Sequence, residues 1–318
     1  MADARGNGAP VTVLAHLAGF GDLMIPALAA AVPDAEFVQV TPGAPPPVPG
    51  EILLTLLNDR PDLGPVVTDD VRWIHVLGAG VDGFPMELVG DRLLTCSRGA
   101  SAVPIADFVL AEMLAFEKKL PDSWITAPPE RWNVADLGGM RGRTLGLVGI
   151  GAIGTEVARR ALAFGMEVVA TRRDLSKPAL AGVAVAPLEE VLRRADHLVI
   201  TAASTPGTRH LLDADTLGML KPGVHVVNIA RGALIDQDAL LAALDRGQVA
   251  MASLDVVEPE PLPDGHPFYA HPRVRLSPHI SWSAPETARR TVELFIENFQ
   301  RYQAGQPLEG VVDTAAGY

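Results

Sequence analysis

Short apolar runs alternate with segments of mixed polarity along the first part of the chain. Four runs between Val11 and Val81 predict β-strands, namely VTVLAHL, EFVQV, EILLTLL and VRWIHVL, and several of the segments between them suit helices. This alternation is typical of a small α/β domain. The proline-rich stretch 41–50 (TPGAPPPVPG) predicts a loop, because proline cannot join the interior of a sheet.

A second alternation begins near Pro104. It predicts strands at 144–150, 167–171, 197–202, 225–230, 250–256 and 274–276, and helices at 105–120, 153–164, 187–195, 238–246 and 285–303. Several of these strands are continuous apolar runs, as expected where helices cover both faces of a parallel sheet. The sequence therefore predicts an α/β fold of two doubly wound domains. One, over 104–284, is inserted into another made of 1–103 and 285–318, with hinges near 99–104 and 283–285.

Composition and charge narrow the class of protein. The 318 residues are 48% hydrophobic and 20% charged with a net charge of −12, which is globular composition without a basic surface for nucleic acid. No uncharged apolar run reaches the roughly 18 residues of a membrane helix. The start, MADARGNGAP, lacks the apolar core of a signal peptide, so we expect a short tail on a cytoplasmic protein. Because Cys96 is the only cysteine, an intrachain disulfide and a cysteine-built metal site are excluded, and we expect no metal.

A glycine pattern marks the start of the second alternation. Residues 149–154, GIGAIG, match G-x-G-x-x-G between the apolar strand TLGLV and an amphipathic helix. Gly149 permits the tight turn, Gly151 lets the backbone approach a pyrophosphate, and Gly154 lets helix and strand pack closely. The predicted phosphate-binding residues are Gly149, Gly151, Ala152, Ile153 and Gly154. The inserted domain is therefore predicted to be a Rossmann dinucleotide-binding domain, and the outer one a flavodoxin-like substrate domain.

The next strand indicates which dinucleotide binds. The acidic residue that binds a ribose 2′-hydroxyl normally ends this strand, but here Thr171 is followed by Arg172 and Arg173. Two guanidinium groups suit a 2′-phosphate, which they bind through charge-assisted hydrogen bonds. We therefore favour NADP, bound as NADPH. The alternative is NAD, with the arginines at a solvated strand end and Asp174 reaching the ribose.

Three further segments follow predicted strands and carry candidate catalytic groups. They are VNIARG at 227–232, LDVVEPEP at 254–261 and SPHI at 277–280. Ligands of open α/β sheets bind outside the carboxyl ends of the strands. We therefore expect Arg231, Glu260 and His279 to converge on the nicotinamide end of the cofactor.

Reduction of a 2-keto acid needs such a set of groups. His279 can donate a proton to the carbonyl oxygen near neutral pH, and Glu260 can orient the imidazole and favour its protonated form. Arg231 can bind the substrate carboxylate through a planar fork that lysine lacks. For each of these three residues taken singly, the alternative is a structural role.

A turn of small residues offers further donors. The segment LGAGVDG at 77–83 follows the strand RWIHV, and its small side chains expose consecutive backbone N–H groups. Such a nest binds carboxylates. Gly78, Ala79 and Gly80 are therefore candidate substrate-binding residues, with a plain turn as the alternative.

Together these segments resemble the D-isomer-specific 2-hydroxyacid dehydrogenase family, from about residue 73 to about residue 286. The catalytic set that the resemblance implies is Arg231, Glu260 and His279. Glu260 is chosen over Glu258 because the family's acid stands just before the second proline of D-V-x-x-x-E-P. A glutamate rather than a glutamine at 260 argues against the formate dehydrogenase branch.

The resemblance also implies further contacts. The residues expected to face the nicotinamide are Ile229, Ala230, Arg231 and Asp255, and those expected at the substrate carboxylate are Ala79 and Gly80. The pair Arg172–Arg173 resembles the NADPH-using glyoxylate and hydroxypyruvate reductases. A homodimer is implied as well, with the helix from Pro104 and the inserted domain at its interface.

Three positions depart from the family pattern. Residues 95–99 are TCSRG where T-N-T-P-G is frequent, and Ala203 stands where a proline is usual. Trp282 follows the His279 loop where many members carry a small residue. Trp282 either forms a wall of the substrate pocket, which would favour a bulkier keto acid, or packs at the domain hinge.

The sequence thus predicts an oxidoreductase that uses NADPH to convert a 2-keto acid, such as glyoxylate or hydroxypyruvate, to the D-2-hydroxy acid in a cleft between domains. Two alternatives stay open. One is a regulatory protein that senses dinucleotides on a dehydrogenase scaffold, and the other is a dehydrogenase acting on another small anion, such as phosphite.

Overall fold

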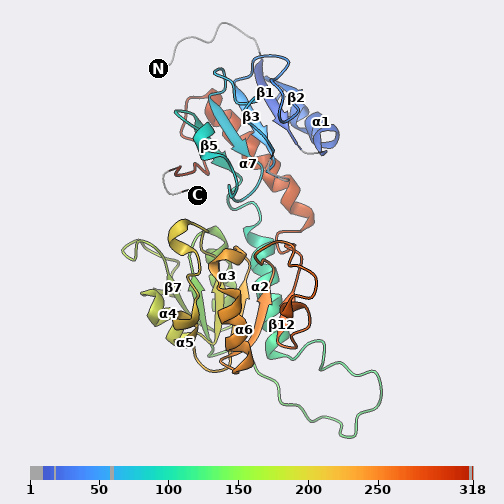
Figure 1. The fold of residues 1–318 in the computed structure, drawn as a ribbon, viewed down its shortest axis with the longest axis vertical. Helices are drawn as coiled ribbons and strands as arrows, with labels where there is room; N and C mark the ends of the chain where they lie inside the picture. Colours follow the sequence, from blue (N-terminus) through green and yellow to red (C-terminus); the bar gives the residue numbers. More distant parts are fainter. Residues whose placement is uncertain (1–9, 18, 58–60, 315–316, 318) are drawn as a thin grey trace. The chain divides into compact units, whose positions relative to one another are not determined.

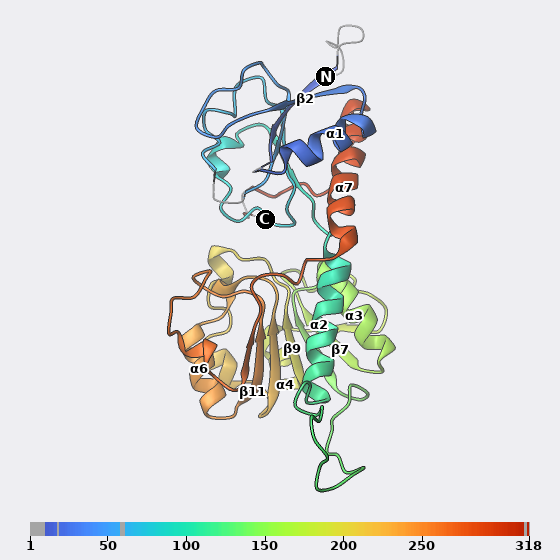
Figure 2. The same cartoon turned by 90° about the vertical axis from the view of Figure 1, so that its right-hand side faces the viewer.

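The computed structural model describes residues 10–17, 19–57, 61–314 and 317. The chain divides into two compact units, unit 1 (Met1–Ser101 and Ala284–Tyr318) and unit 2 (Ala102–Ser283). The predicted N-terminal tail lies outside the described residues, apart from Pro10. Each unit is built on one parallel sheet (Figures 1 and 2), which is the α/β architecture that the sequence predicts.

Unit 2 contains a parallel sheet whose seven described strands have the order β12-β11-β10-β9-β6-β7-β8. The strands are β6 (Thr144–Val148), β7 (Glu167–Thr171), β8 (Val183–Val185), β9 (His197–Ile200), β10 (Val224–Asn228), β11 (Val249–Leu254) and β12 (Val274–Leu276). The strand order reverses between β6 and β9. This reversal is the point at which doubly wound sheets bind dinucleotides.

Helices cover both faces of this sheet. One face packs against α2 (Ala102–Glu117) and α3 (Ala152–Ala163), and the other against α4 (Leu188–Arg194), α5 (Ala214–Gly218) and α6 (Gln237–Asp245). Consecutive strand residues such as Leu198 and Val199 belong to opposite core clusters, because side chains alternate across a strand. Both sets are buried, and this explains why the strands are continuous apolar runs.

Unit 1 contains a smaller parallel sheet, with the described order β2-β1-β3-β4-β5 that is typical of flavodoxin-like folds. Its strands are β1 (Val11–His16), β2 (Ala35–Gln39), β3 (Ile52–Thr55), β4 (Trp73–Val76) and β5 (Leu93–Cys96). Helices α1 (Gly21–Ala31) and α7 (Pro285–Gln303) cover one face, where Phe295 stacks on Trp73. Segments between residues 63 and 89 cover the other face.

Several short elements are absent from the sequence prediction. β5, β8 and α5 are short, with four, three and five residues. α5 begins instead at a local signal, because the Asp213 carboxylate caps the backbone N–H of Thr216 at 2.9 Å. Short 3-10 turns lie at Met86–Leu88 (η1), Pro206–Thr208 (η2), Gly232–Leu234 (η3) and Pro267–Tyr269 (η4). Among the residues described, the helices are too short or too polar to cross a membrane.

One long connection extends from unit 2 between α2 and β6, and we call residues 121–137 the arm (Figures 1 and 2). Every residue of the arm is exposed, and Trp124 and Trp132 are 71% and 74% exposed. Lys119, just before the arm, forms an ion pair of 3.4 Å with Asp136, near the end of the arm. The arm therefore presents large apolar side chains that are not packed within their own unit.

Candidate active site

The predicted phosphate loop joins β6 to α3. Gly149 has a φ of +102°, and a Cβ there would lie 2.8 Å from the backbone nitrogen of Ala202. A Cβ on Gly154 would lie 2.7 Å from the carbonyl oxygen of Gly149. Packing within the protein therefore requires both of these glycines.

Gly151 differs from the other two glycines of the loop. A Cβ on Gly151 would meet no atom within 4 Å, and its backbone is extended, so neither packing nor conformation requires a glycine. Gly151 is the N-cap of α3, which has no side-chain cap and no acidic residue in its first turn. The N–H groups of Ala152 and Ile153 and the space beside Gly151 thus fit the pyrophosphate of an NAD(P) cofactor.

The end of β7 carries the residues predicted to bind the ribose, which are Thr171, Arg172 and Arg173. Arg172 is half-buried and donates to the carbonyl oxygen of Pro178 at 3.2 Å, whereas Arg173 is exposed. The alternative ribose ligand, Asp174, accepts hydrogen bonds from the hydroxyl of Ser176 at 2.6 Å and from its backbone nitrogen at 3.0 Å. These bonds hold the pKa of Asp174 below its ordinary value. The same oxygen of Asp174 accepts both bonds, so this carboxylate already closes a local turn.

The candidate catalytic residues follow three neighbouring strands. Arg231 follows β10, Asp255 follows β11 and His279 follows β12, and these strands are adjacent in the sheet. The carboxyl ends of parallel strands lie at one edge, which is also the edge of the phosphate loop after β6. The fold therefore brings these residues and the phosphate loop, far apart in the sequence, to the same edge of one sheet.

Glu260 and His279 are in direct contact. The Nδ1 atom of His279 lies 2.9 Å from Oε2 of Glu260, and both side chains are about two-fifths exposed. The other carboxylate oxygen of Glu260 accepts the backbone N–H of Val257 at 3.1 Å. The neighbouring Glu258 instead pairs with Arg209 at 2.9 Å, and this bond lowers the pKa of Glu258. Of the two glutamates, Glu260 is the one that faces the imidazole.

Arg231 ends a turn that the side chain of Asn228 closes. The Oδ1 atom of Asn228 accepts the N–H of Ala230 at 3.0 Å, and its Nδ2 donates to the carbonyl oxygen of Arg231 at 2.9 Å. Ile229 and Ala230 are buried, and Nη1 of Arg231 donates to the Ala230 carbonyl at 2.6 Å. The sequence prediction gave Asn228 no role. An asparagine at the end of a strand, which bonds the backbone two residues on, is the signal that identifies it.

Asp255 is buried beneath the His279 loop. Its carboxylate accepts hydrogen bonds from the hydroxyl of Ser277 at 2.5 Å and from the backbone nitrogens of Ile280 and Ser281 at 2.9 Å each. The resemblance placed Asp255 at the nicotinamide, and that contact stays a prediction. What the structure adds is a bond network between Asp255 and the residues on both sides of His279, including Ser277, which the sequence prediction did not single out.

The turn after β4 in unit 1 has its carbonyl groups engaged. The Gly78 carbonyl accepts the N–H of Ser97 at 2.9 Å, and the thiol of Cys96 lies 3.6 Å from the Ala79 carbonyl. Because a trans peptide is planar, the N–H groups of Ala79 and Gly80 point away from these partners. The N–H groups of Ala79 and Gly80 are therefore not engaged by these two partners, and the nest stays a prediction.

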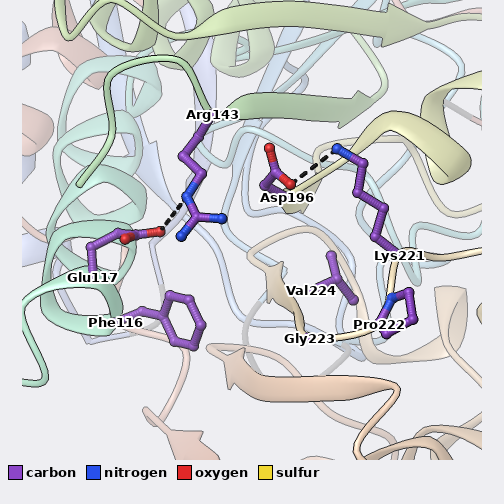
Figure 3. Close-up of a pocket in the computed structure, with 8 residues that line it drawn as sticks. All are labelled: Phe116, Glu117, Arg143, Asp196, Lys221, Pro222, Gly223 and Val224. Carbon is purple, nitrogen blue, oxygen red and sulfur yellow. Dashed lines mark hydrogen bonds and ion pairs between the residues drawn. The ribbon is translucent and has the colours of Figure 1, made fainter. Parts of the chain in front are cut away.

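A second polar cluster lies at the opposite, amino-terminal edge of the unit 2 sheet. It lines a cavity of about 100 Å³, where Glu117 pairs with Arg143 at 3.4 Å and Asp196 with Lys221 at 3.0 Å (Figure 3). The four charges balance, and the cavity is far smaller than the pocket a dinucleotide needs. It is therefore not the candidate active site. Across the described chain, no cluster of three His, Cys, Asp or Glu side chains suits a metal ion.

Comparisons with known proteins agree with this arrangement. A family model described as D-isomer specific 2-hydroxyacid dehydrogenase, NAD binding domain, matches residues 110–281. Glyoxylate/hydroxypyruvate reductase A of Serratia proteamaculans (strain 568) is 32% identical over 260 residues, which cover 78% of this chain and 82% of the relative. Glyoxylate reductase of Korarchaeum cryptofilum (strain OPF8) is 34% identical over 269 residues, 80% of each chain.

A solved structure is similar over nearly the whole chain. It is a D-isomer specific 2-hydroxyacid dehydrogenase from Xanthobacter autotrophicus Py2 in complex with NADPH and MES. The TM-score is 0.84 at 29% sequence identity, and the match covers 98% of this chain and 100% of that chain. The similarity therefore extends through both units rather than the dinucleotide-binding unit alone.

Proposed function

Because this chain belongs to the D-isomer specific 2-hydroxyacid dehydrogenase family, we propose that it uses NADPH to reduce a small 2-keto acid, of the glyoxylate or hydroxypyruvate kind, to the D-2-hydroxy acid. As a member of the family it is an NAD(P)-dependent 2-keto acid reductase. The finer proposal depends on one observation above all, the 2.9 Å contact between His279 and Glu260.

His279 is the proton donor in this proposal. Its Nδ1 atom faces Glu260, so Nε2 is the nitrogen that delivers a proton to the keto oxygen. The Glu260 carboxylate fixes the orientation of the ring and stabilises the imidazolium before the proton leaves. When bound, NADPH supplies the hydride that the keto carbon accepts.

Two sets of donors are assigned to the substrate carboxylate. The guanidinium of Arg231 offers a planar fork, and the segment Gly78, Ala79 and Gly80 is predicted to offer backbone N–H groups. Such local donors are needed because the protein carries a net charge of −12 and its ligand is an anion.

The preference for NADPH follows from the end of β7. Arg172 and Arg173 stand where a ribose-binding acid is expected, and Asp174 is already bonded to Ser176. A 2′-phosphate offers these guanidinium groups a doubly charged partner that NAD lacks. The similar enzyme from Xanthobacter autotrophicus Py2, which is in complex with NADPH, supports the same preference.

We further propose that the protein is a homodimer in which the arm of each subunit packs against the other subunit. A fully exposed tryptophan side chain has about 250 Å² of surface. Because Trp124 and Trp132 are 71% and 74% exposed, burying both would remove about 360 Å² of surface per arm. Two reciprocal arms then bury about 720 Å² from four side chains alone, nearly half of a standard interface of about 1,600 Å². A second copy of the chain is favoured as the partner because a two-fold axis repeats the same contact between arm and subunit, once from each chain.

The experiment that tests the function compares His279→Ala with His210→Ala. His210 is a matched control, since it is equally exposed, also has a positive φ, and lies 4.0 Å from the carboxylate of Asp236. We expect His279→Ala to lose at least about 100-fold in turnover of glyoxylate or hydroxypyruvate with unchanged NADPH affinity, and His210→Ala to retain turnover. Unchanged turnover in His279→Ala would reject the proton-donor role. Negligible turnover of every keto acid by the wild type would favour the dinucleotide sensor.

A further inference from the structure

His279 has a backbone conformation that residues with a Cβ rarely adopt. Its φ is +55°, in the left-handed region. Such a conformation persists only where the surrounding bonds enforce it. The side chain of His279 leaves from this backbone, so the bonds that hold the backbone also set the direction in which the imidazole faces Glu260.

Asp255 holds the chain as it enters and passes His279. The N–H of His279 donates to the backbone carbonyl of Asp255 at 2.9 Å. The Asp255 carboxylate accepts from Ser277 before the histidine and from Ile280 and Ser281 after it. The bond from the Ile280 N–H holds one side of the planar peptide that follows His279, and the His279 carbonyl oxygen lies on the other side of that peptide.

Trp282 supplies a partner for that carbonyl oxygen. Its indole Nε1 donates to the carbonyl oxygen of His279 at 2.8 Å. The two residues are three positions apart in a loop that contains no helix or strand. The indole is 48% exposed, so burial in a core does not account for a tryptophan here. The contact instead ties the peptide that leaves His279 to a rigid side chain.

We propose that Trp282 is a positioning residue for His279, which acts by holding the His279 carbonyl and thereby the direction in which the imidazole presents its proton. This inference rests on the proposed function, because it assumes that His279 donates the proton. The two roles that the sequence suggested for Trp282, a wall of the substrate pocket and a packing residue at the hinge, stay predictions beside it.

The consequence of losing this bond follows from geometry. Without the indole donor the peptide between residues 279 and 280 is held on one side only, by the bond from the Ile280 N–H to Asp255, and it can tilt as the His279 carbonyl turns to water. A displacement of about 1 Å at a reacting group can cost on the order of 100-fold in rate. Since the Asp255 bonds remain, we expect a smaller loss of about 10-fold in the chemical step.

The test uses Trp282→Phe, which keeps an aromatic ring and removes the N–H donor. The control is Arg273→Met, which removes a 2.8 Å hydrogen bond from the guanidinium to the backbone carbonyl of Leu244. Arg273 precedes β12, at the end of the strand opposite to the His279 loop. Single-turnover rates of NADPH oxidation are measured by stopped flow in H₂O and D₂O, with NADPH affinity and thermal stability measured on the same samples. His279→Ala is run in parallel.

We expect Trp282→Phe to slow the single-turnover step about 10-fold and to raise its solvent isotope effect, because a misdirected proton donor makes proton transfer more limiting. NADPH affinity and the melting temperature stay at the wild-type values, and Arg273→Met keeps the wild-type rate. A wild-type rate and isotope effect in Trp282→Phe, with His279→Ala inactive, would overturn this inference alone. Full activity in His279→Ala would overturn it together with the proposed function.

Discussion

Replacing Glu117 with glutamine tests whether the second polar cluster stabilises unit 2. Glu117 ends α2, and its carboxylate accepts from Nε2 of the buried His197 at 3.0 Å and lies 3.4 Å from Arg143. The hydrogen bonds continue from His197 through Nδ1 of His225 to Ser253, whose hydroxyl donates to Glu112. This chain of bonds ties α2 to three strands of the sheet.

The donors and acceptors of this network can be followed from Glu112 to Glu117. Ser253 donates to Glu112, so it accepts from Nε2 of His225, and Nδ1 of His225 is left as an acceptor. The Nδ1 atom of His225 faces Nδ1 of His197 at 3.2 Å, and Nε2 of His197 faces the Glu117 carboxylate at 3.0 Å. Burial, joined by the charges of His197 and Arg275, holds the pKa of His225 well below its ordinary value, in agreement with a neutral ring.

Glu117→Gln removes the buried carboxylate charge that faces both His197 and Arg143. Breaking a buried pair by removing one partner costs about 3–5 kcal/mol, and we take about 3 kcal/mol because the amide oxygen can still accept the His197 N–H. For a unit of this size the melting temperature then falls by about 6–12 °C at pH 7. Glu167→Gln is the control, because the Glu167–Arg194 pair is exposed at 3.6 Å and is worth about 0–1 kcal/mol.

The difference between Glu117→Gln and wild type also depends on pH. Burial raises the pKa of Glu117, but the hydrogen bond and charge of His197 and the charge of Arg143 outweigh it, so this pKa lies below the ordinary value of 4.5. A depressed carboxyl pKa contributes stability that is present above 4.5 and lost as the pH falls through the folded-state value. Thermal unfolding at pH 7 and at stepwise lower pH checks this. A difference under about 0.5 kcal/mol at pH 7, or one that does not narrow on acidification, would refute the reasoning.

Three further predictions concern the cofactor and the arm. Arg172→Ala should weaken NADPH binding by about 10- to 100-fold, since a charge-assisted bond contributes about 1.5–3 kcal/mol, and should barely change NADH binding. Equal losses in fluorescence titrations of the two cofactors would contradict the NADPH preference. Gly151→Ala should keep the wild-type melting temperature yet weaken both cofactors, whereas Gly154→Ala should lower the melting temperature, because its Cβ would lie 2.7 Å from a backbone oxygen. The reverse pattern would show that Gly151 serves packing. The double variant Trp124→Ser and Trp132→Ser should sediment with the mass of a monomer rather than that of a dimer. A dimer mass in this variant would exclude the arm from the interface.

Long elements were predictable because each one carries many periods of its pattern. The prediction for α7, 285–303, coincides with the observed helix, and the predictions for β7 and β12 coincide with the observed strands. The helix predicted over 105–120 instead spans Ala102–Glu117. It begins earlier because proline is tolerated in a first turn, as at Pro104, and it ends before Leu120, which precedes Pro121. The short elements β5, β8 and α5 escaped prediction, and β5 and β8 exist through pairing with neighbouring strands. Length alone does not decide this, since β12 has only three residues.

The chain by itself determined the fold class, the position of the phosphate loop and the types of group that 2-keto acid reduction needs. These properties follow from local pattern, since strand and helix periods and the glycine spacing lie within short segments. The family resemblance chose Glu260 over Glu258. Only the tertiary structure decided the distance between Glu260 and His279, that Asp255 bonds the loop around that histidine, and that Trp282 donates to its carbonyl. The physical reason is that these contacts join residues that follow different strands, or turn back within an irregular loop, and only the assembled sheet edge fixes their distances.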